Sequence, residues 1–446
     1  RYCIRPSPAR FIHTTTFDAA RTMAGTWKPW KSAASADRRW PVACTASARR
    51  RKCAPRNAAG LSGNAKDARP GSSVSGGAEI GFGRDDAASF DKVISGTGGL
   101  RKRGVGMLTL GGNNSGFAGG IILESGQLVL LTSNAAGTGP IETQGSIITY
   151  ANGVDNAAPL VINSASTQLD VAGTDHATQS GNISESGGSR PLDKIGTGQL
   201  DLTGSSTLSG IFSVRFGTLG VGNDAAFGDA SGTNFLDIKG GATVLAIGGA
   251  RAINQTIRVN GDATIDAGGE QFTLNGTIGD NPGPNAQPLN LTDSVGGGRI
   301  ILASGSNYTG GTSITNAIVQ IGADTALGAF SPVAMDNSTL ETSASITTTR
   351  TFTLTNANTF DTMGNDLALD GAVGGAGSLR KEGTGTLILG VANSYGGGTF
   401  IGNGAVQIGT DANLGTAGTS VTFDNTGNGQ LITTAGIVTN QIGRAS

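Results

Sequence analysis

The side chains that could carry hydrolytic chemistry are few, and they centre on the two histidines of this 446-residue chain. A nucleophilic Ser-His-Asp arrangement needs a histidine as its base, and only His13 and His176 are present. Asp175, His176 and Ser180 are close in sequence, but adjacent residues of a strand point to opposite faces, so Asp175 would not orient His176. No Gly-x-Ser-x-Gly nucleophile elbow occurs. We therefore interpret His176 as a surface-loop histidine.

Carboxylates are the second catalytic possibility, because stacked strands can align acids and bases along one face. Asp266 and Asp361 occupy equivalent positions in a sequence repeat, and with Asp170 they could line up on one face. Two carboxylates that act on a glycosidic bond must lie within about 10 Å of each other. Residues one repeat apart would be separated by several coils, which is too far. We therefore interpret the three residues as solvated turn aspartates.

Metal and phosphate sites find no support in the glycine-rich stretches. A calcium-binding roll needs tandem Gly-Gly-x-Gly-x-Asp, and the nearest approach, 374–379, has Leu379 in place of the carboxylate. The glycine runs neither follow the Gly-x-Gly-x-x-Gly spacing nor open a helix, and no Walker lysine occurs. We predict no catalytic, cofactor-binding or metal-binding residue, no cofactor, and a chain that is not an enzyme.

The composition divides the chain into two parts. Residues 1–70 carry fifteen Lys or Arg against three Asp or Glu, although the whole chain has a net charge of only −1. All three cysteines and all three tryptophans also lie there. The basic run 49–53 is compatible with a nucleic-acid-binding arm or a transit peptide. We favour a disordered basic tail, or residues that are not native, and expect no nucleic-acid partner. The predicted domains are 1–75, a basic Pro/Arg-rich segment, and 76–446, a repeat region.

The repeat region contains four copies of one unit, starting near residues 93, 192, 289 and 377. Each copy opens with a Gly-x-Gly-x-apolar-x-Leu core, at 104–110, 196–202, 296–302 and 383–389. An Asn-x-Tyr-x-Gly-Gly-Thr element, a Gly-x-Val-Gln-Ile element and an Asp-x-Ala-Leu-Gly element follow in constant order, best seen at 307–328 and 393–415. Apolar residues alternate with Thr, Ser and Asn, the period of a strand with one buried face. Four elements in constant order make chance similarity very unlikely.

Short strands joined by Gly and Asn leave no room for crossover helices. Asn-Gly pairs such as Asn152-Gly and Asn260-Gly keep an antiparallel hairpin arrangement open. Recurrence at long and variable spacing favours a solenoid, in which the chain winds into coils of about 20 residues and loops absorb the differences. On this length we expect about 18 coils. The predicted fold is all-β, a parallel β-helix preceded by an irregular basic N-terminal segment.

The combination of motifs at 298–328 and 383–415 resembles the autotransporter-associated β-strand repeat of autotransporter passenger domains. The resemblance covers roughly residues 93–446. It implies a right-handed parallel β-helix that is exported through the outer membrane of a Gram-negative cell and displayed or released at the cell surface. It also implies a translocating outer-membrane β-barrel as a partner. We find neither the barrel nor a secretory signal in this sequence, and expect it to be a fragment.

The predicted function is that of an adhesive or structural rod. Ladders of Thr, Ser and Asn would present repeated hydrogen-bonding groups, and weak contacts become strong when they are repeated. The expected partners are a host or matrix glycan or protein, or another copy of the rod. Two alternatives stay open: a polysaccharide-acting enzyme on the same β-helix, and a passive spacer for a missing effector domain.

Overall fold

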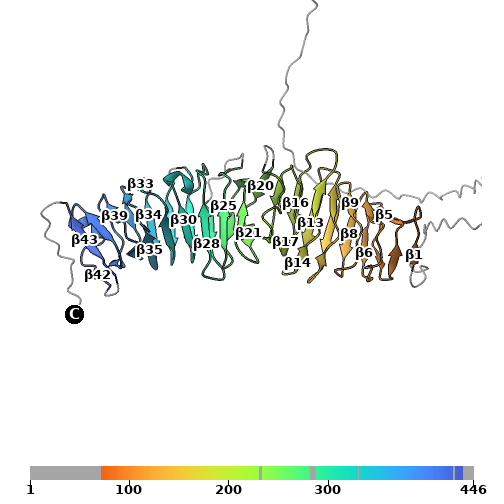
Figure 1. The fold of residues 1–446 in the computed structure, drawn as a ribbon, viewed down its shortest axis with the longest axis horizontal. Coiled ribbons are helices and arrows are strands. Elements are labelled where there is room, and N and C mark those ends of the chain that lie inside the picture. Colours follow the sequence, from red (N-terminus) through yellow and green to blue (C-terminus); the bar gives the residue numbers. More distant parts are fainter. Residues whose placement is uncertain (1–71, 231–233, 282–287, 330, 425–426, 435–446) are drawn as a thin grey trace, which may run out of the picture. The chain divides into compact units, whose positions relative to one another are not determined.

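The repeat region winds into a single stack of β-coils. The computed structural model describes residues 72–230, 234–281, 288–329, 331–424 and 427–434, so the predicted basic segment lies almost wholly outside it. Within these residues the solenoid makes about 17 turns, and every strand pairing is parallel. Figure 1 shows the strands lying across the stacking direction, from β1 to β43. The predicted parallel solenoid is confirmed, and the antiparallel alternative is wrong for the described residues.

Six sheets, here named A to F, run along the stack. Sheet A holds β1 (Ser72–Val74) and β4 (Ile94–Gly96). Sheet B holds β2 (Glu79–Gly83), β5 (Gly99–Arg103), β7 (Ile121–Leu123), β9 (Ile141–Thr143), β12 (Leu160–Ile162) and β15 (Ile183–Glu185). Sheet C holds β3 (Ala88–Phe90), β6 (Met107–Leu110), β8 (Gln127–Leu130), β10 (Ile147–Tyr150), β13 (Thr167–Val171), β16 (Leu192–Ile195), β18 (Phe212–Val214), β20 (Phe235–Ile238), β23 (Thr256–Val259) and β26 (Ile278–Asp280).

The later sheets complete the stack. Sheet D holds β11 (Asp155–Asn156), β14 (His176–Gln179), β17 (Gln199–Leu202), β19 (Thr218–Val221), β21 (Thr243–Ala246), β24 (Thr264–Asp266), β27 (Leu289–Thr292), β29 (Thr312–Thr315), β31 (Val333–Asp336), β34 (Phe352–Thr355) and β37 (Val373–Gly374). Sheet E holds β22 (Arg251–Ile253), β25 (Gln271–Leu274), β28 (Arg299–Leu302), β30 (Ile318–Ile321), β32 (Thr339–Thr342), β35 (Ala357–Asp361), β38 (Ser378–Glu382), β40 (Thr399–Ile401) and β42 (Val421–Phe423). Sheet F holds β33 (Ile346–Thr348), β36 (Leu367–Leu369), β39 (Thr386–Leu389), β41 (Ala405–Ile408) and β43 (Gln430–Thr433). Two 3-10 helices, η2 (Asp324–Leu327) and η3 (Asp411–Leu414), are the helices of the described residues.

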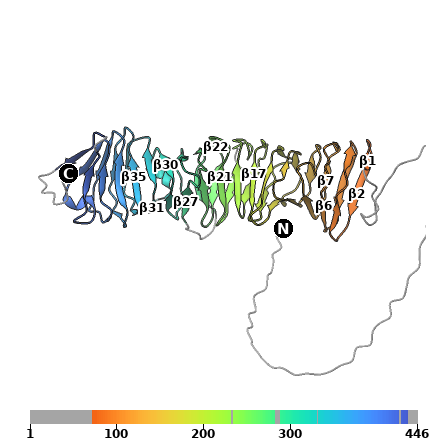
Figure 2. The same ribbon diagram turned by 90° about the horizontal axis from the view of Figure 1, so that it is seen from below.

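Coil length varies around the predicted value. Ile141 pairs with Leu160, 19 residues later, whereas Gln271 pairs with Arg299, 28 residues later. Loops between strands absorb this variation, so the strands stay in register. The turned view in Figure 2 shows the same continuous stack of strands.

The core is a column of apolar ladders inside the coils. In sheet D the inward residues of successive strands are all buried: Ala177, Leu200, Leu219, Val244, Ile265, Leu291, Ile314, Met335 and Leu354. Burial of apolar side chains contributes about 25 cal/mol per Å². Stacking one coil on the next buries both of their inner faces, which explains why the alternating pattern specifies the solenoid.

The six sheets form three continuous faces, and each face is interrupted where two segments, one coil apart, are not strands. We call the residues from the first of these segments to the second a break, and the four breaks are residues 114–137, 206–228, 307–328 and 393–415. Between its two segments, each break contains one strand from each of the other two faces. The first joins sheet A to sheet D, since Gly96 bridges Phe117, whose carbonyl accepts from Thr138, and Ser133 accepts from Asp155 N. By the same kind of bonds the second joins sheets B and E and the third joins sheets C and F. The fourth follows β37 of sheet D.

Each repeat unit therefore begins one face further round than the unit before it. The four equivalent cores lie in β6, β17, β28 and β39, which belong to sheets C, D, E and F. Sheets C and F are the same face, so the fourth unit returns to the face of the first. Residues at equivalent sequence positions thus point in three different directions from the axis.

Candidate functional surfaces

His176 is exposed, as the sequence predicts, but it lies in strand β14 and not in a loop, and its partner comes from the next coil. Its Nε2 is 2.7 Å from Oδ2 of Asp201, and Gln199 donates to the other oxygen of that carboxylate at 2.8 Å. Ser180 donates to Asp155 at 2.5 Å. Neither Asp175 nor Ser180 is a partner of His176, so the arrangement is a cross-coil pair and not a triad. His13 lies outside the described residues.

The three aspartates that could have lined up on one face do not share one. Asp170 lies in β13 of sheet C, Asp266 in β24 of sheet D and Asp361 in β35 of sheet E. They do not line up because each repeat unit advances by one face, which the sequence spacing does not reveal. The three carboxylates lie on different sides of the solenoid and cannot act on one bond.

The same aspartates are not uniformly solvated either. Asp266 is 7% exposed, and its Oδ1 accepts from the amides of Gly268 and Ser294. Asp361 accepts from the amide of Met363 at 2.7 Å. These carboxylates therefore stabilise turns. In the part of the chain that the structure describes, no three His, Cys, Asp or Glu side chains gather as metal ligands would.

Sheet D carries the longest polar ladder of the solenoid. One outward residue from each of nine successive strands lies in register: His176, Gln199, Thr218, Thr243, Thr264, Asn290, Ser313, Ala334 and Thr353. We call this row the sheet D ladder. It contains no Asp, Glu, Lys or Arg, and the eleven strands of sheet D contain no Lys or Arg at all. Neighbouring rungs are about 4.8 Å apart, the separation of paired strands.

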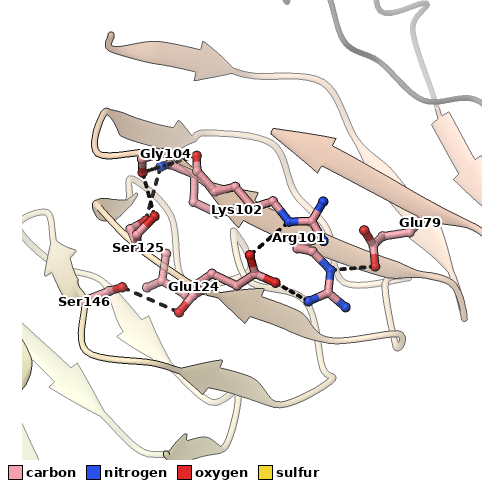
Figure 3. A network of polar contacts seen from close by, with 9 residues as sticks. Glu79, Arg101, Lys102, Gly104, Glu124, Ser125 and Ser146 are labelled. Carbon is pink, nitrogen blue, oxygen red and sulfur yellow. Dashed lines mark hydrogen bonds and ion pairs between the residues drawn. The ribbon is translucent and has the colours of Figure 1, made fainter. Parts of the chain in front are cut away.

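A second kind of outward surface is charged but internally paired. Figure 3 shows Arg101 of β5 between Glu79 of β2 and Glu124, which follows β7, at 2.9 and 2.5 Å. Arg103 also reaches Glu124, at 2.9 Å. The hydrogen bonds from the two arginines hold the pKa of Glu124 below its usual value. Because each charge has an opposite partner, this network links coils and leaves little net charge to attract a ligand.

Sequence reasoning missed three buried lysines, Lys102, Lys194 and Lys381, which are 1%, 0% and 0% exposed. Each is the third residue of a Leu-x-Lys-x-Gly-x-Gly stretch. The signal was available, because alternation after the buried leucine places the lysine on the inner face. Burial lowers the pKa of Lys194 and of Lys381 to about 8.

Comparison with known proteins matches the four repeat units. The model of the passenger-associated-transport-repeat matches residues 100–130, 192–221, 295–321 and 379–408. These stretches contain the four cores and the strands that follow them. An adhesin autotransporter of Brucella suis biovar 1 (strain 1330), BmaC, is 32% identical over 202 residues. The chain is an autotransporter passenger with transport-associated repeats.

The alignment with this relative is local. It covers 42% of the passenger and 6% of the Brucella protein, so the passenger spans a small part of the relative's length. No solved structure matches the passenger. As an autotransporter passenger it belongs at the cell surface or outside the cell. Among the described residues of the passenger, no helix has the length and apolar character to cross a membrane.

Proposed function

We propose that this passenger is a non-catalytic adhesive rod, and that the sheet D ladder is its contact surface. The ladder supports this proposal because eight of its nine rungs, all except Ala334, carry hydrogen-bonding side chains at one repeated spacing. A contact that is weak at one rung becomes strong when several rungs engage together. The relative named an adhesin supports the same role. The proposed partners are a host or matrix glycan or protein, or a second copy of the rod, together with an outer-membrane translocator.

The rotation of the repeat units favours a ladder over a repeat-encoded site. Equivalent residues of successive units lie on different faces, so a site encoded once per unit would not be repeated along one face. Neighbouring rungs of the sheet D ladder come from different positions of the repeat unit, yet strand pairing places them on one face. A surface for multivalent contact therefore requires an uninterrupted sheet, and not a residue that recurs once per repeat unit.

The experiment places charge within the ladder. Thr243 and Thr264 are adjacent rungs of sheet D, and Thr339 and Thr359 are adjacent outward residues of sheet E. We expect Thr243→Arg with Thr264→Arg to abolish binding of the purified chain to glycan and matrix-protein arrays, or its self-association. Thr339→Arg with Thr359→Arg is the matched control and should retain both.

Two results would contradict the proposal. If the unaltered chain shows no adhesion and no self-association, a passive spacer is the better description. If the sheet D and sheet E variants lose binding equally, the ladder is not the contact surface. Circular dichroism of each variant shows whether the strands are intact.

A further inference from the structure

Three lysines stand on the inner face of the solenoid, one each in sheets B, C and E. Lys194 in β16 pairs with Leu169 below it and Val214 above it, both fully buried. Lys102 and Lys381 likewise stand in register between apolar residues of their neighbouring strands. A charged group in such a ladder is costly unless its donors are satisfied. Whether the three lysines stabilise the solenoid therefore depends on the hydrogen-bond acceptors around their ammonium groups.

Each ammonium group is held by main-chain carbonyl oxygens. Nζ of Lys194 donates to Ile195 O at 3.2 Å, Gly196 O at 2.7 Å, Gly198 O at 2.7 Å and Phe216 O at 2.9 Å. These oxygens come from the Gly-x-Gly corner of its own coil and from the corner of the next coil. The lysine therefore joins two coils at one corner.

The other two lysines repeat this geometry on the face that sheets B and E form. Lys102 donates to Arg103 O, Gly104 O and Ser125 O at 3.0, 2.7 and 3.3 Å. Lys381 donates to Glu382 O, Gly383 O and Asn403 O at 2.6, 2.7 and 3.1 Å. We call each set of carbonyl oxygens a corner cage. Three independent copies of the same contacts show that the cage is a built feature of the repeat.

A glycine of the next coil closes each cage. Gly126, Gly217 and Gly404 have positive φ, and a Cβ on Gly126 or Gly404 would lie 2.8 Å from the lysine Nζ. A Cβ on Gly217 would lie 2.6 Å from Gly198 O. The Cβ would also lie 2.5 Å from Gly106 O at Gly126 and 2.3 Å from Gly383 O at Gly404, so all three positions exclude a side chain through the main chain of the preceding coil.

The remaining repeat unit lacks both parts of the cage. Leu291 occupies the position in this repeat unit that corresponds to the lysines. The corner between its strand, β27, and the next strand, β28, is longer than in the other units. Ala317 occupies the position of the closing glycine and is 3% exposed. At this corner a carboxylate takes the place of the ammonium group and binds main-chain amides instead of carbonyl oxygens. The Asp293 carboxylate accepts from the amides of Gly269 and Gly298 at 2.7 and 2.6 Å. Lysine and closing glycine are thus lost together.

We propose that Lys102, Lys194 and Lys381 are tethered cations that lock successive coils in register, and that each corner cage is a site for a small monovalent cation. Ammonium or potassium would enter a cage once its lysine is truncated. The chemical basis is the ring of convergent carbonyl oxygens, which bind any compact cation of suitable size. This role is independent of the adhesive function, because the cages lie inside the solenoid.

The first test removes the ammonium charge of Lys194 and keeps an unbranched apolar side chain in its place. Lys194→Met in the full chain leaves the carbonyl oxygens of its cage without a donor, so we expect a lower melting temperature at pH 7. Lys92→Met removes an exposed lysine and is the matched control, for which we expect no change. If Lys194→Met melts at or above the temperature of the unaltered chain, a buried lysine is no lock and the proposal is overturned.

The second test supplies the cation from solution. Lys194→Ala opens space next to the cage, and we expect ammonium chloride to raise its melting temperature towards that of the unaltered chain. Tetramethylammonium chloride at equal concentration is the control, because this ion is too large for the cage and has no N–H donor. Equal effects of the two salts on Lys194→Ala would overturn the cation site. Lys92→Ala should respond to neither.

Discussion

The hydroxyl oxygens of Tyr308 and Thr312 lie 2.7 Å apart inside the third break, and both side chains are buried. The fourth break repeats the pair as Tyr395 and Thr399, also at 2.7 Å. The first two breaks have apolar pairs at the same positions, Phe117 with Ile121 and Leu208 with Phe212. At these two positions each break thus has either two hydroxyl groups or none, as expected if a buried hydroxyl needs a partner.

This covariation predicts a non-additive pair of substitutions. Tyr308→Phe leaves the Thr312 hydroxyl with a 3.4 Å contact to Leu327 O, so we expect the free energy of unfolding to fall by about 1 to 2 kcal/mol. Adding Thr312→Ile removes the orphaned hydroxyl and should recover part of the loss. Urea unfolding of the single and double variants measures the difference. A double variant less stable than Tyr308→Phe would contradict the prediction.

The closing glycines of the corner cages give a matched comparison. Gly126 has φ 79° and Gly153 has φ 74°. Substitution by alanine should therefore cost the same backbone free energy, about 1 to 2 kcal/mol, at either position. A Cβ at Gly126 would lie 2.5 Å from Gly106 O, whereas at Gly153 it meets nothing within 4 Å. We expect Gly126→Ala to lower the melting temperature well beyond Gly153→Ala. Equal losses would show that only φ matters at Gly126.

The sequence was sufficient to predict the β-coils, but not to predict the face of the solenoid on which each repeat unit begins. Alternation around Leu387 and Leu389, with glycines on both sides, predicts a short half-buried strand, and the four-unit pattern predicts a solenoid. The face on which each unit begins depends on the summed lengths of its coils. Those lengths vary with loops that have no periodic signal, so the sequence could not show that Asp266 and Asp361 lie on different faces.

Side-chain partners were predictable only where they are local. Asp201 lies 25 residues after His176, and this pairing requires the coil length at that point. Lys194 could have been found, because strand alternation alone places it inside. It was missed because a lysine in a polar, glycine-rich stretch is usually solvated.

Arg350 forms a buried ion pair that predicts a large loss of stability. Its side chain is 1% exposed, its Nε lies 2.7 Å from Asp324 of η2, and its guanidinium donates to Gly328 O and Ala329 O at 2.6 Å. Truncation would remove the donors of several carbonyl oxygens and of the Asp324 carboxylate, which is 15% exposed. We expect Arg350→Met to cost about 3 to 5 kcal/mol of unfolding free energy, measured in urea.

Arg251 is the control for this prediction because it begins a similar sequence stretch. It donates to Ile247 O and Gly248 O at 2.9 and 2.7 Å, and it is partly exposed. Water can replace it, so Arg251→Met should cost about 1 kcal/mol. If the two variants are equally stable, the burial of Arg350 has no energetic consequence.

The buried lysines predict how stability changes in mild alkali. Burial lowers the pKa of Lys194 and Lys381 to about 8 in the folded chain, from the ordinary value of 10.5. Between these values the unfolded chain binds more protons than the folded chain. The free energy of unfolding should therefore rise from pH 8 towards pH 10, and below pH 8 these lysines should give no slope. The rise reflects the cost of burying the charge; the neutral amine keeps two N–H donors for the carbonyl oxygens of its cage.

Tyrosines set the upper limit of this window. Burial raises the pKa of Tyr308 and Tyr395 to about 12, so above the ordinary value of 10.0 their ionisation favours the unfolded chain. The measurement is a series of urea transitions between pH 7 and pH 10. Lys194→Met with Lys381→Met should flatten the rise, whereas Lys92→Met should leave it unchanged. A rise of the same steepness in the double variant would mean that other groups cause it, since both lysines that titrate near pH 8 would then be absent.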